Sequence, residues 1–188
     1  MNLDRLLQAL SAIHPVSESL KAAIEKELVS LSLPKDYLLL EAPKISRHVY
    51  FLDSGFAMSF TYVNGEKCVD NFWNAGQIII SARSFFEQVP SLEFIQLTEK
   101  SDVMYFSHDG VAAFPEASTI YRIVMTQYYE QAKEKFRDMH QLSAEQRHEK
   151  LLKQFPRVGQ MVSQEYIASY LGITPQSLSR IKRRRSRS

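Results

Sequence analysis

Three polar side chains near the C-terminus have the types and the spacing that suit contact with base edges. Gln176, Ser177 and Arg180 lie within one short segment. Leu178 and Ile181 are spaced there for the buried side of a helix, so the three polar residues face outward. Glutamine bonds adenine through two hydrogen bonds, arginine bonds guanine in the same way, and serine reaches a base or a phosphate. This combination indicates contact with nucleic acid.

A basic tail follows this segment directly. Residues 182–188 read Lys-Arg-Arg-Arg-Ser-Arg-Ser. Such a cluster neutralises phosphates, which gives affinity and salt dependence without sequence information. The candidate DNA-binding residues are therefore Thr174, Gln176, Ser177, Arg180, Lys182, Arg183 and Arg184.

Two short helices are expected to position these side chains. Ser163 has the type that caps a helix, and Gly172 supplies the left-handed residue that ends it. Thr174 then caps a second helix, with Pro175 at its first position. Ala168 is small where the two helices must approach each other. The pattern predicts a helix-turn-helix, whose second helix enters the major groove of DNA.

The net charge of +2 hides a gradient along the chain. From Arg157 onward there are seven basic residues and one acidic residue, which leaves 16 basic and 20 acidic residues before it. We therefore expect a larger acidic module, followed by a basic module that binds a polyanion. The acidic module is expected to have a separate function.

The first 115 residues predict that larger module. Two short helices broken at His14-Pro15 precede about eight short, aromatic and β-branched runs between residues 37 and 107. Asn64-Gly65 is the strongest hairpin signal, because a type I′ turn needs a positive φ at both central residues. The pattern favours an α+β protein that begins with an antiparallel β-roll, a jelly-roll-like structure with flanking helices.

A long helix is predicted between the two modules, because residues 116–140 contain no glycine or proline. Its length exceeds what a small sheet needs, which favours pairing with a second copy over simple cover of the sheet. The expected domains are a β-roll sensor at 1–115, a dimerisation helix at 116–140 and a DNA-binding domain at 141–188. The candidate dimerisation residues are Ile120, Ile123, Val124, Gln127 and Gln131.

Several function classes do not fit the composition. The single cysteine, Cys68, excludes disulfide scaffolds and iron–sulfur sites within one chain, and it favours a reducing cytoplasm. The five histidines are scattered, and no glycine-rich phosphate loop or nucleophile elbow is present, so we expect no catalytic residues and no bound metal. No membrane span or signal peptide is visible.

Two segments resemble the Crp/Fnr family of bacterial transcription regulators. The first is Tyr166–Thr174 followed by Ser177–Ile181, and the second is the Gly65 hairpin leading to Phe72–Gly76. The resemblance, which extends from about residue 10 to the end, implies a cyclic-nucleotide-binding-like β-roll, a dimerisation helix and a winged-helix DNA-binding domain. It also implies a homodimer with a double-stranded DNA operator and RNA polymerase as partners.

The sequence departs from the nucleotide-binding members of that family. Where they carry a Gly-Glu pair for the ribose and an Arg-Ser/Thr-Ala run for the phosphate, gap-free counting gives Ile80-Ser81 and Ser91-Leu92-Glu93. A carboxylate at Glu93 would repel a phosphate, so cyclic AMP is not the expected effector. No cofactor is expected and the effector stays open. The candidate effector pocket consists of Ile80, Ser81, Arg83, Phe85 and Phe86.

Other interpretations stay open at this point. The apolar residues around the candidate pocket either line a cavity for an effector or fill the roll completely. Haem sensing would use Cys68, His48 or His108, although a lone cysteine in a strand is more typical of a core. The alternative function is a roll that binds a protein or a small ligand and carries an accessory DNA-binding end. A cupin-type enzyme is disfavoured, because no His-x-His occurs.

Overall fold

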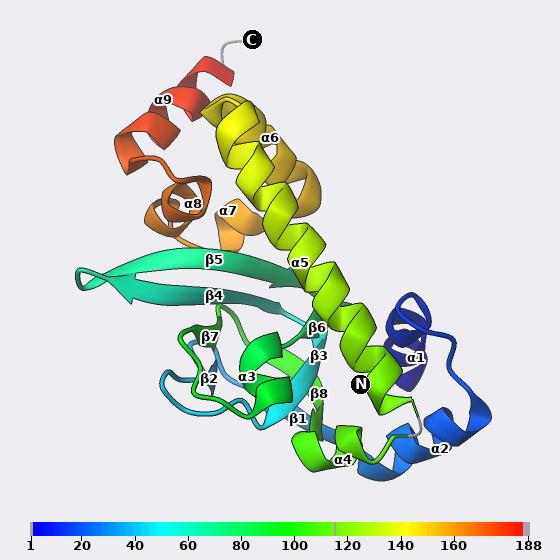
Figure 1. Ribbon diagram of the computed structural model, residues 1–188. Coiled ribbons are helices and arrows are strands. Elements are labelled where there is room, and N and C mark those ends of the chain that lie inside the picture. The colour runs from blue at the N-terminus through cyan, green and yellow to red at the C-terminus, as the bar shows by residue number, and fades with distance from the viewer. Residues whose placement is uncertain (1, 115, 186–188) are drawn as a thin grey trace.

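The computed structural model describes residues 2–114 and 116–185. Its strands form two antiparallel sheets, and its helices lie on both sides of them (Figure 1). The helices are α1 (Leu3–Ser11), α2 (Glu18–Glu27), α3 (Ala82–Glu87), α4 (His108–Ala112), α5 (Ala117–Gln141), α6 (Ala144–Gln154), α7 (Val158–Met161), α8 (Gln164–Leu171) and α9 (Pro175–Arg185). The strands are β1 (Val29–Leu33), β2 (Leu38–Leu40), β3 (His48–Ser54), β4 (Phe56–Val63), β5 (Glu66–Asn74), β6 (Ile78–Ile79), β7 (Phe94–Leu97) and β8 (Ser101–Ser107).

The two sheets form the predicted β-roll. One sheet has the strand order β1-β8-β3-β6 and the other β2-β7-β4-β5. Apolar side chains from both sheets, among them Leu52, Trp73, Ile95 and Val103, pack together in one buried cluster. The protein is therefore of the α+β class.

The hairpin between β4 and β5 is built as the sequence predicts. Asn64 and Gly65 have φ values of 53° and 83°, which are the positive values that a type I′ turn requires. The strands pair from Val63 and Glu66 back to Phe56 and Asn74, and the register shifts once, between Ser59 and Phe60. The hairpin extends away from the rest of the roll (Figure 1).

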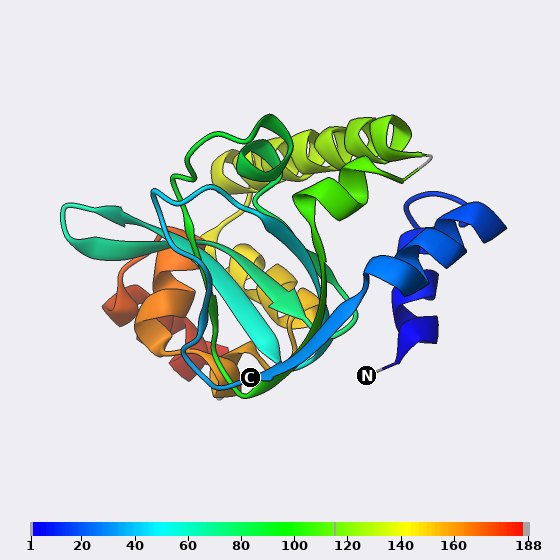
Figure 2. The same cartoon turned by 90° about the horizontal axis from the view of Figure 1, so that it is seen from below.

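The N-terminal helices cover the outer face of the sheet that contains β3 and β8. Ser17 caps α2 by accepting a hydrogen bond from the backbone of Leu20. Leu6 of α1 and Ile24 of α2 are buried in one cluster with Phe51 and Met104 of the sheet. Figure 2 shows both helices on one side of the roll.

The long helix α5 runs past the roll and reaches the C-terminal helices (Figures 1 and 2). It has 25 residues, which corresponds to about 37 Å, and none of them is fully buried. Two lysines bind it to its neighbours. Lys135 donates to the backbone carbonyl of Asp70 on β5, and Lys150 of α6 contacts Glu134 and Asp138 at 2.6 and 2.5 Å.

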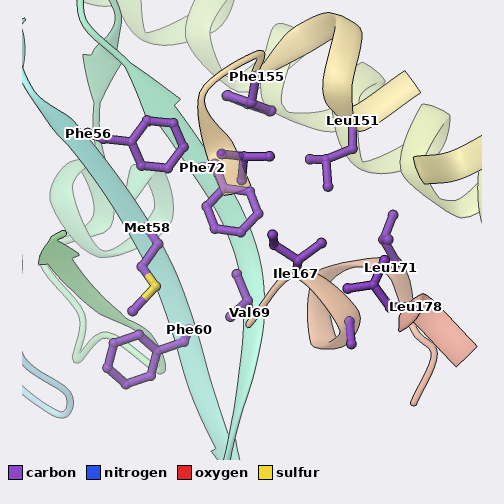
Figure 3. Packing of buried hydrophobic residues seen from close by; sticks show 12 residues of the cluster. Phe56, Met58, Phe60, Val69, Phe72, Leu151, Phe155, Ile167, Leu171 and Leu178 are labelled. Atoms are coloured by element: carbon purple, nitrogen blue, oxygen red, sulfur yellow. The ribbon is translucent and has the colours of Figure 1, made fainter. Parts of the chain in front are cut away.

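The C-terminal helices share a hydrophobic cluster with β4 and β5. A capping box between Ser143 and Gln146 opens α6. The fully buried Phe155 contacts the ring of Phe72 on β5, with centroids 5.8 Å apart. Figure 3 shows side chains of the strands and of the helices meeting in this cluster. The domain boundary predicted at residue 141 stays a prediction, and the cluster contains residues from both sides of it.

Three local features differ from the predictions. The strand β1 begins at Val29, inside the region predicted to precede the sheet, because its backbone pairs with the distant β8. The short helix α3 was not predicted, since six residues carry too little periodicity. The predicted wing is not seen: the described residues contain no strand after Ser107, and residues 186–188 lie outside them.

Candidate nucleic-acid interface

Three local features fix the start of α8, its end and the start of α9. The Ser163 hydroxyl caps α8 by accepting from the backbone of Tyr166 at 3.3 Å. Gly172 ends α8 with a φ of 65°, the left-handed conformation that glycine adopts without strain. The Thr174 hydroxyl accepts from the backbone of Ser177 at 3.2 Å, so it caps α9. Each residue takes the position that the sequence predicts.

One side of α9 is buried and the other is open. Leu178 is 0% exposed and belongs to the cluster shared with the roll. Gln176, Arg180 and Arg183 lie on the opposite side, where they line a shallow surface hollow together with Pro175 and Ser179. The first three residues were predicted from the sequence as DNA contacts, and Pro175 and Ser179 were not. Ser179 follows the buried Leu178 and precedes Arg180, so helical spacing is the signal that could have placed it on the exposed side.

The other predicted contacts lie on the flanks of α9. Lys182 donates to the side-chain oxygen of Gln164 at the start of α8, at 3.1 Å. Arg184 contacts Glu145 at the start of α6, at 3.3 Å. Ser177 is half-buried. The structure thus separates the seven predicted residues into an exposed face of three, two side chains beside neighbouring helices, and the cap residue Thr174 with Ser177, whose hydroxyl accepts from that of Thr174 at 3.1 Å.

The α8–α9 pair is held on the edge of the roll. The Ser169 hydroxyl accepts from the backbone of Val69 at 2.9 Å and donates to the carbonyl of Lys67 at 3.3 Å. The rings of Tyr170 and Phe72 lie with centroids 4.9 Å apart. Because α9 packs on α8 through Leu178, these contacts also set the direction in which the exposed face of α9 points.

The predicted dimerisation residues do not share one open face. Ile120 and Val124 line a cavity between α5 and the roll, and Ile123 is half-buried. Gln127 and Gln131 are exposed. The most exposed large apolar side chains of α5 are instead Tyr129 and Phe136, at 62% and 65%.

The predicted effector residues lie in three different places. Ile80, Phe85 and Phe86 line the same apolar cavity as Val124. The buried Ser81 faces Ser91, with hydroxyl oxygens 3.4 Å apart. Arg83 is exposed and pairs with Glu87 at 3.2 Å. These five residues therefore do not form a single pocket.

Glu93 has an unusual electrostatic environment. Burial raises the pKa of its carboxyl group, a hydrogen bond from Ser81 opposes this, and the neighbouring Asp70 raises it further. Burial also raises the pKa of Tyr128 on α5, and the nearby Glu93 carboxylate adds to this increase. The Glu93 carboxyl group thus lies beside Ser81. Gap-free counting aligned these two residues with the phosphate and ribose sites of the nucleotide-binding Crp/Fnr proteins.

Neither a metal centre nor a membrane span stands out. In the two described segments, 2–114 and 116–185, no group of three or more His, Cys, Asp or Glu side chains is arranged to hold a metal ion. None of the helices in the same segments combines the length and the apolar character that crossing a membrane requires.

Comparison with known proteins identifies the fold. No family model and no curated protein sequence matches the chain. Among solved structures, the chain is similar to the c-di-GMP-responsive global regulator CLP from Xanthomonas campestris (13% identity, 88% of this chain and 91% of that one, TM-score 0.66). It is also similar to FixK2 from Bradyrhizobium japonicum (15%, 84% and 83%, TM-score 0.71) and to the Thermus thermophilus catabolite activator protein (14%, 93% and 86%, TM-score 0.57). The chain has a Crp/Fnr-like fold.

Proposed function

We propose that this protein is a sequence-specific transcription regulator that binds double-stranded DNA as a homodimer. In this proposal α8 and α9 form a helix-turn-helix, and α9 lies in the major groove. The observation that carries it is the exposed face of α9, where Gln176, Arg180 and Arg183 lie opposite the buried Leu178. Two of these side chains are cationic, and α9 contains no acidic residue. Such a face suits base edges and phosphates together.

Each residue of this face has a different expected role. Gln176 and Arg180 lie nearest the N-terminal end of α9, which in a helix-turn-helix contacts base edges. Arg183 lies one turn further and binds a phosphate. Lys182 and Arg184 already contact Gln164 and Glu145, so they contribute charge near the backbone of the DNA and read no base.

The homodimer is proposed to form through the open side of α5. Residues spaced by three and four share one face of a helix, which places Met125, Tyr129, Ala132 and Phe136 in one stripe. This stripe replaces the face predicted from the sequence, because Ile120 and Val124 point into the protomer. A two-fold dimer binds a roughly palindromic operator with half-sites about 10 base pairs apart.

The effector of this regulator is proposed not to be a cyclic nucleotide. A phosphate placed beside Ser81 and Ser91 would meet the Glu93 carboxyl group, and no cation among the described residues bonds to that carboxyl. Calorimetric titration with cyclic AMP is expected to show no binding. Saturable binding would overturn this part of the proposal.

The DNA-binding proposal is tested by selecting bound DNA from a random library. Wild-type protein is expected to enrich a palindromic motif. Arg180→Ala is expected to lower affinity for it by about 1–3 kcal/mol and to relax preference at one base pair of each half-site. Arg183→Ala is expected to weaken all sequences alike and to reduce the salt slope by about one.

Arg137→Ala is the matched control, because Arg137 is an exposed arginine of α5 outside the α9 face. It should leave both the motif and the salt slope unchanged. If wild-type protein enriched no sequence, the proposed function would be wrong. If Arg180→Ala selected the same motif as wild-type protein, the base-reading role of Arg180 would be wrong. The proposal that the protein binds DNA would not be affected by that result.

A further inference from the structure

A small cavity lies between the roll and the helices that cover it. It has a volume of about 70 Å³ and is bounded by residues of α1, α2, α3, α4, the first half of α5 and the outer face of the β3–β8 sheet. Figure 2 shows α1 and α2 on one side of the roll and α5 running along another. Residues far apart in the sequence therefore line this volume.

The lining of the cavity is apolar. Of the seventeen described residues that line it, sixteen are leucine, isoleucine, valine or phenylalanine. The other is Tyr50, whose hydroxyl donates to the backbone carbonyl of Leu39 at 3.4 Å. Arg83, the one cation among the predicted effector residues, is exposed, pairs with Glu87 and does not line the cavity. A charged ligand would find no partner there.

Water is a poor occupant of such a volume. A buried water molecule makes about three hydrogen bonds to polar groups, and apolar cavities stay dry for that reason. An empty cavity in turn lowers stability, because the lining atoms lose van der Waals contacts on one side. A small apolar molecule restores those contacts without breaking any hydrogen bond.

The size of the cavity limits the occupant. An engineered apolar cavity of about 150 Å³ binds benzene or xenon. The cavity in this protein has about half that volume, 70 Å³, so it suits an atom or a molecule smaller than benzene. We propose that it is a binding site for a small, uncharged, apolar molecule.

The position of the site gives such a ligand contact with α5. Ile120 and Val124 line the cavity, while Tyr129 and Phe136 lie on the open side of the same helix. An occupant therefore packs directly against the helix that we propose as the dimer interface. The binding site itself does not depend on DNA binding or on dimerisation, and the experiment below uses no DNA.

Xenon is the probe that tests the site. Full-length protein with labelled methyl groups is titrated with xenon under pressure and followed by NMR. We expect saturable shifts of the methyl signals of Ile80, Ile120 and Val124, all of which line the cavity. Benzene is expected to bind wild-type protein at least tenfold more weakly than it binds Ile80→Ala, which enlarges the cavity.

Val124→Phe fills the cavity and is expected to abolish the saturable xenon shifts at Ile80 and Ile120. Thr126→Val is the matched control, since Thr126 lies on the same helix, is exposed and does not line the cavity. Absence of saturable shifts in wild-type protein would overturn the proposal. An unchanged response in Val124→Phe with a well-dispersed spectrum would do the same. If Val124→Phe does not fold, the benzene comparison with Ile80→Ala decides.

Discussion

The hydroxyl group of Ser169 on α8 bonds the edge of the roll at the backbone of Val69 on β5. It accepts from the Val69 N–H at 2.9 Å, and it donates to the Lys67 carbonyl at 3.3 Å. Because β5 is an edge strand of its sheet, these two backbone groups have no neighbouring strand to pair with. One side chain of the helix pair thus satisfies two backbone groups of the roll and fixes the position of α8.

Ser169→Ala is therefore expected to destabilise the protein. The substitution leaves one donor and one acceptor of β5 without their partner, and such groups cost about 1–3 kcal/mol when half-buried or buried. Urea denaturation followed by circular dichroism measures the change in the free energy of unfolding. Ser179→Ala, on the exposed face of α9, is the control and should change it by less than about 0.5 kcal/mol. Equal effects of the two variants would show that the Ser169 contacts contribute little.

The roll and the C-terminal helices are expected to unfold together. Phe155 and Phe72 lie in one buried cluster that the two parts share, so the C-terminal helices and the strands β4 and β5 stabilise each other, in addition to the cluster inside the roll. The single tryptophan, Trp73, reports on the roll, and the far-ultraviolet circular dichroism is dominated by the helices. Phe155→Ala is expected to lower the free energy of unfolding by about 3–5 kcal/mol and to shift both signals by the same amount. A shift of the dichroism transition alone would show that the two parts are energetically independent.

Much of the fold is readable from local signals in the sequence. Asn64-Gly65 specifies its turn through backbone preference, and Ser163, Gly172 and the Ser143–Gln146 capping box specify helix ends in the same way. These features depend on residues only a few positions apart. The strand β1 was not predicted, because its pairing partner β8 lies about 70 residues further along the chain.

The candidate site was predictable only in part, for the same reason. Helical spacing alone puts Gln176 and Arg180 on one side of α9. The partners of Lys182 and Arg184, which are Gln164 and Glu145, lie on other helices and carry no local signal. The apolar cavity behind Val124 likewise needs residues from eight helices and strands to meet, and no single segment shows it.

Glu93 is expected to make the protein less stable as the pH rises. Burial and the nearby Asp70 raise the pKa of its carboxyl group in the folded state, so the folded protein binds this proton more tightly than the unfolded chain does. Its contribution to stability is complete below the ordinary carboxyl pKa and is lost as the pH rises through the folded value. Each pKa unit corresponds to about 1.4 kcal/mol.

Glu93→Gln removes this proton linkage. The variant is expected to be more stable than wild-type protein at pH 7 and to lose less stability between pH 4 and pH 7 in urea denaturation. Glu87→Gln serves as the control, because Glu87 is a more open carboxylate that pairs with Arg83. If the stability of wild-type protein rose between pH 4 and pH 7, and Glu93→Gln showed the same slope, the pH dependence could not be assigned to Glu93.

Phe136 is expected to be a central residue of the dimer interface. Its side chain is 65% exposed on α5, in the stripe with Tyr129, and a buried aromatic anchor of this kind contributes at least about 2 kcal/mol to association. Phe136→Glu places two like charges near the two-fold axis and is expected to weaken the dimer at least about thirtyfold. Sedimentation velocity over a concentration series measures this change. Gln127→Glu carries the same charge on the face predicted from sequence alone, and it should leave the dimer intact. If the Gln127→Glu dimer dissociated and the Phe136→Glu dimer did not, the interface would lie on the face predicted from the sequence and not on the stripe that contains Phe136.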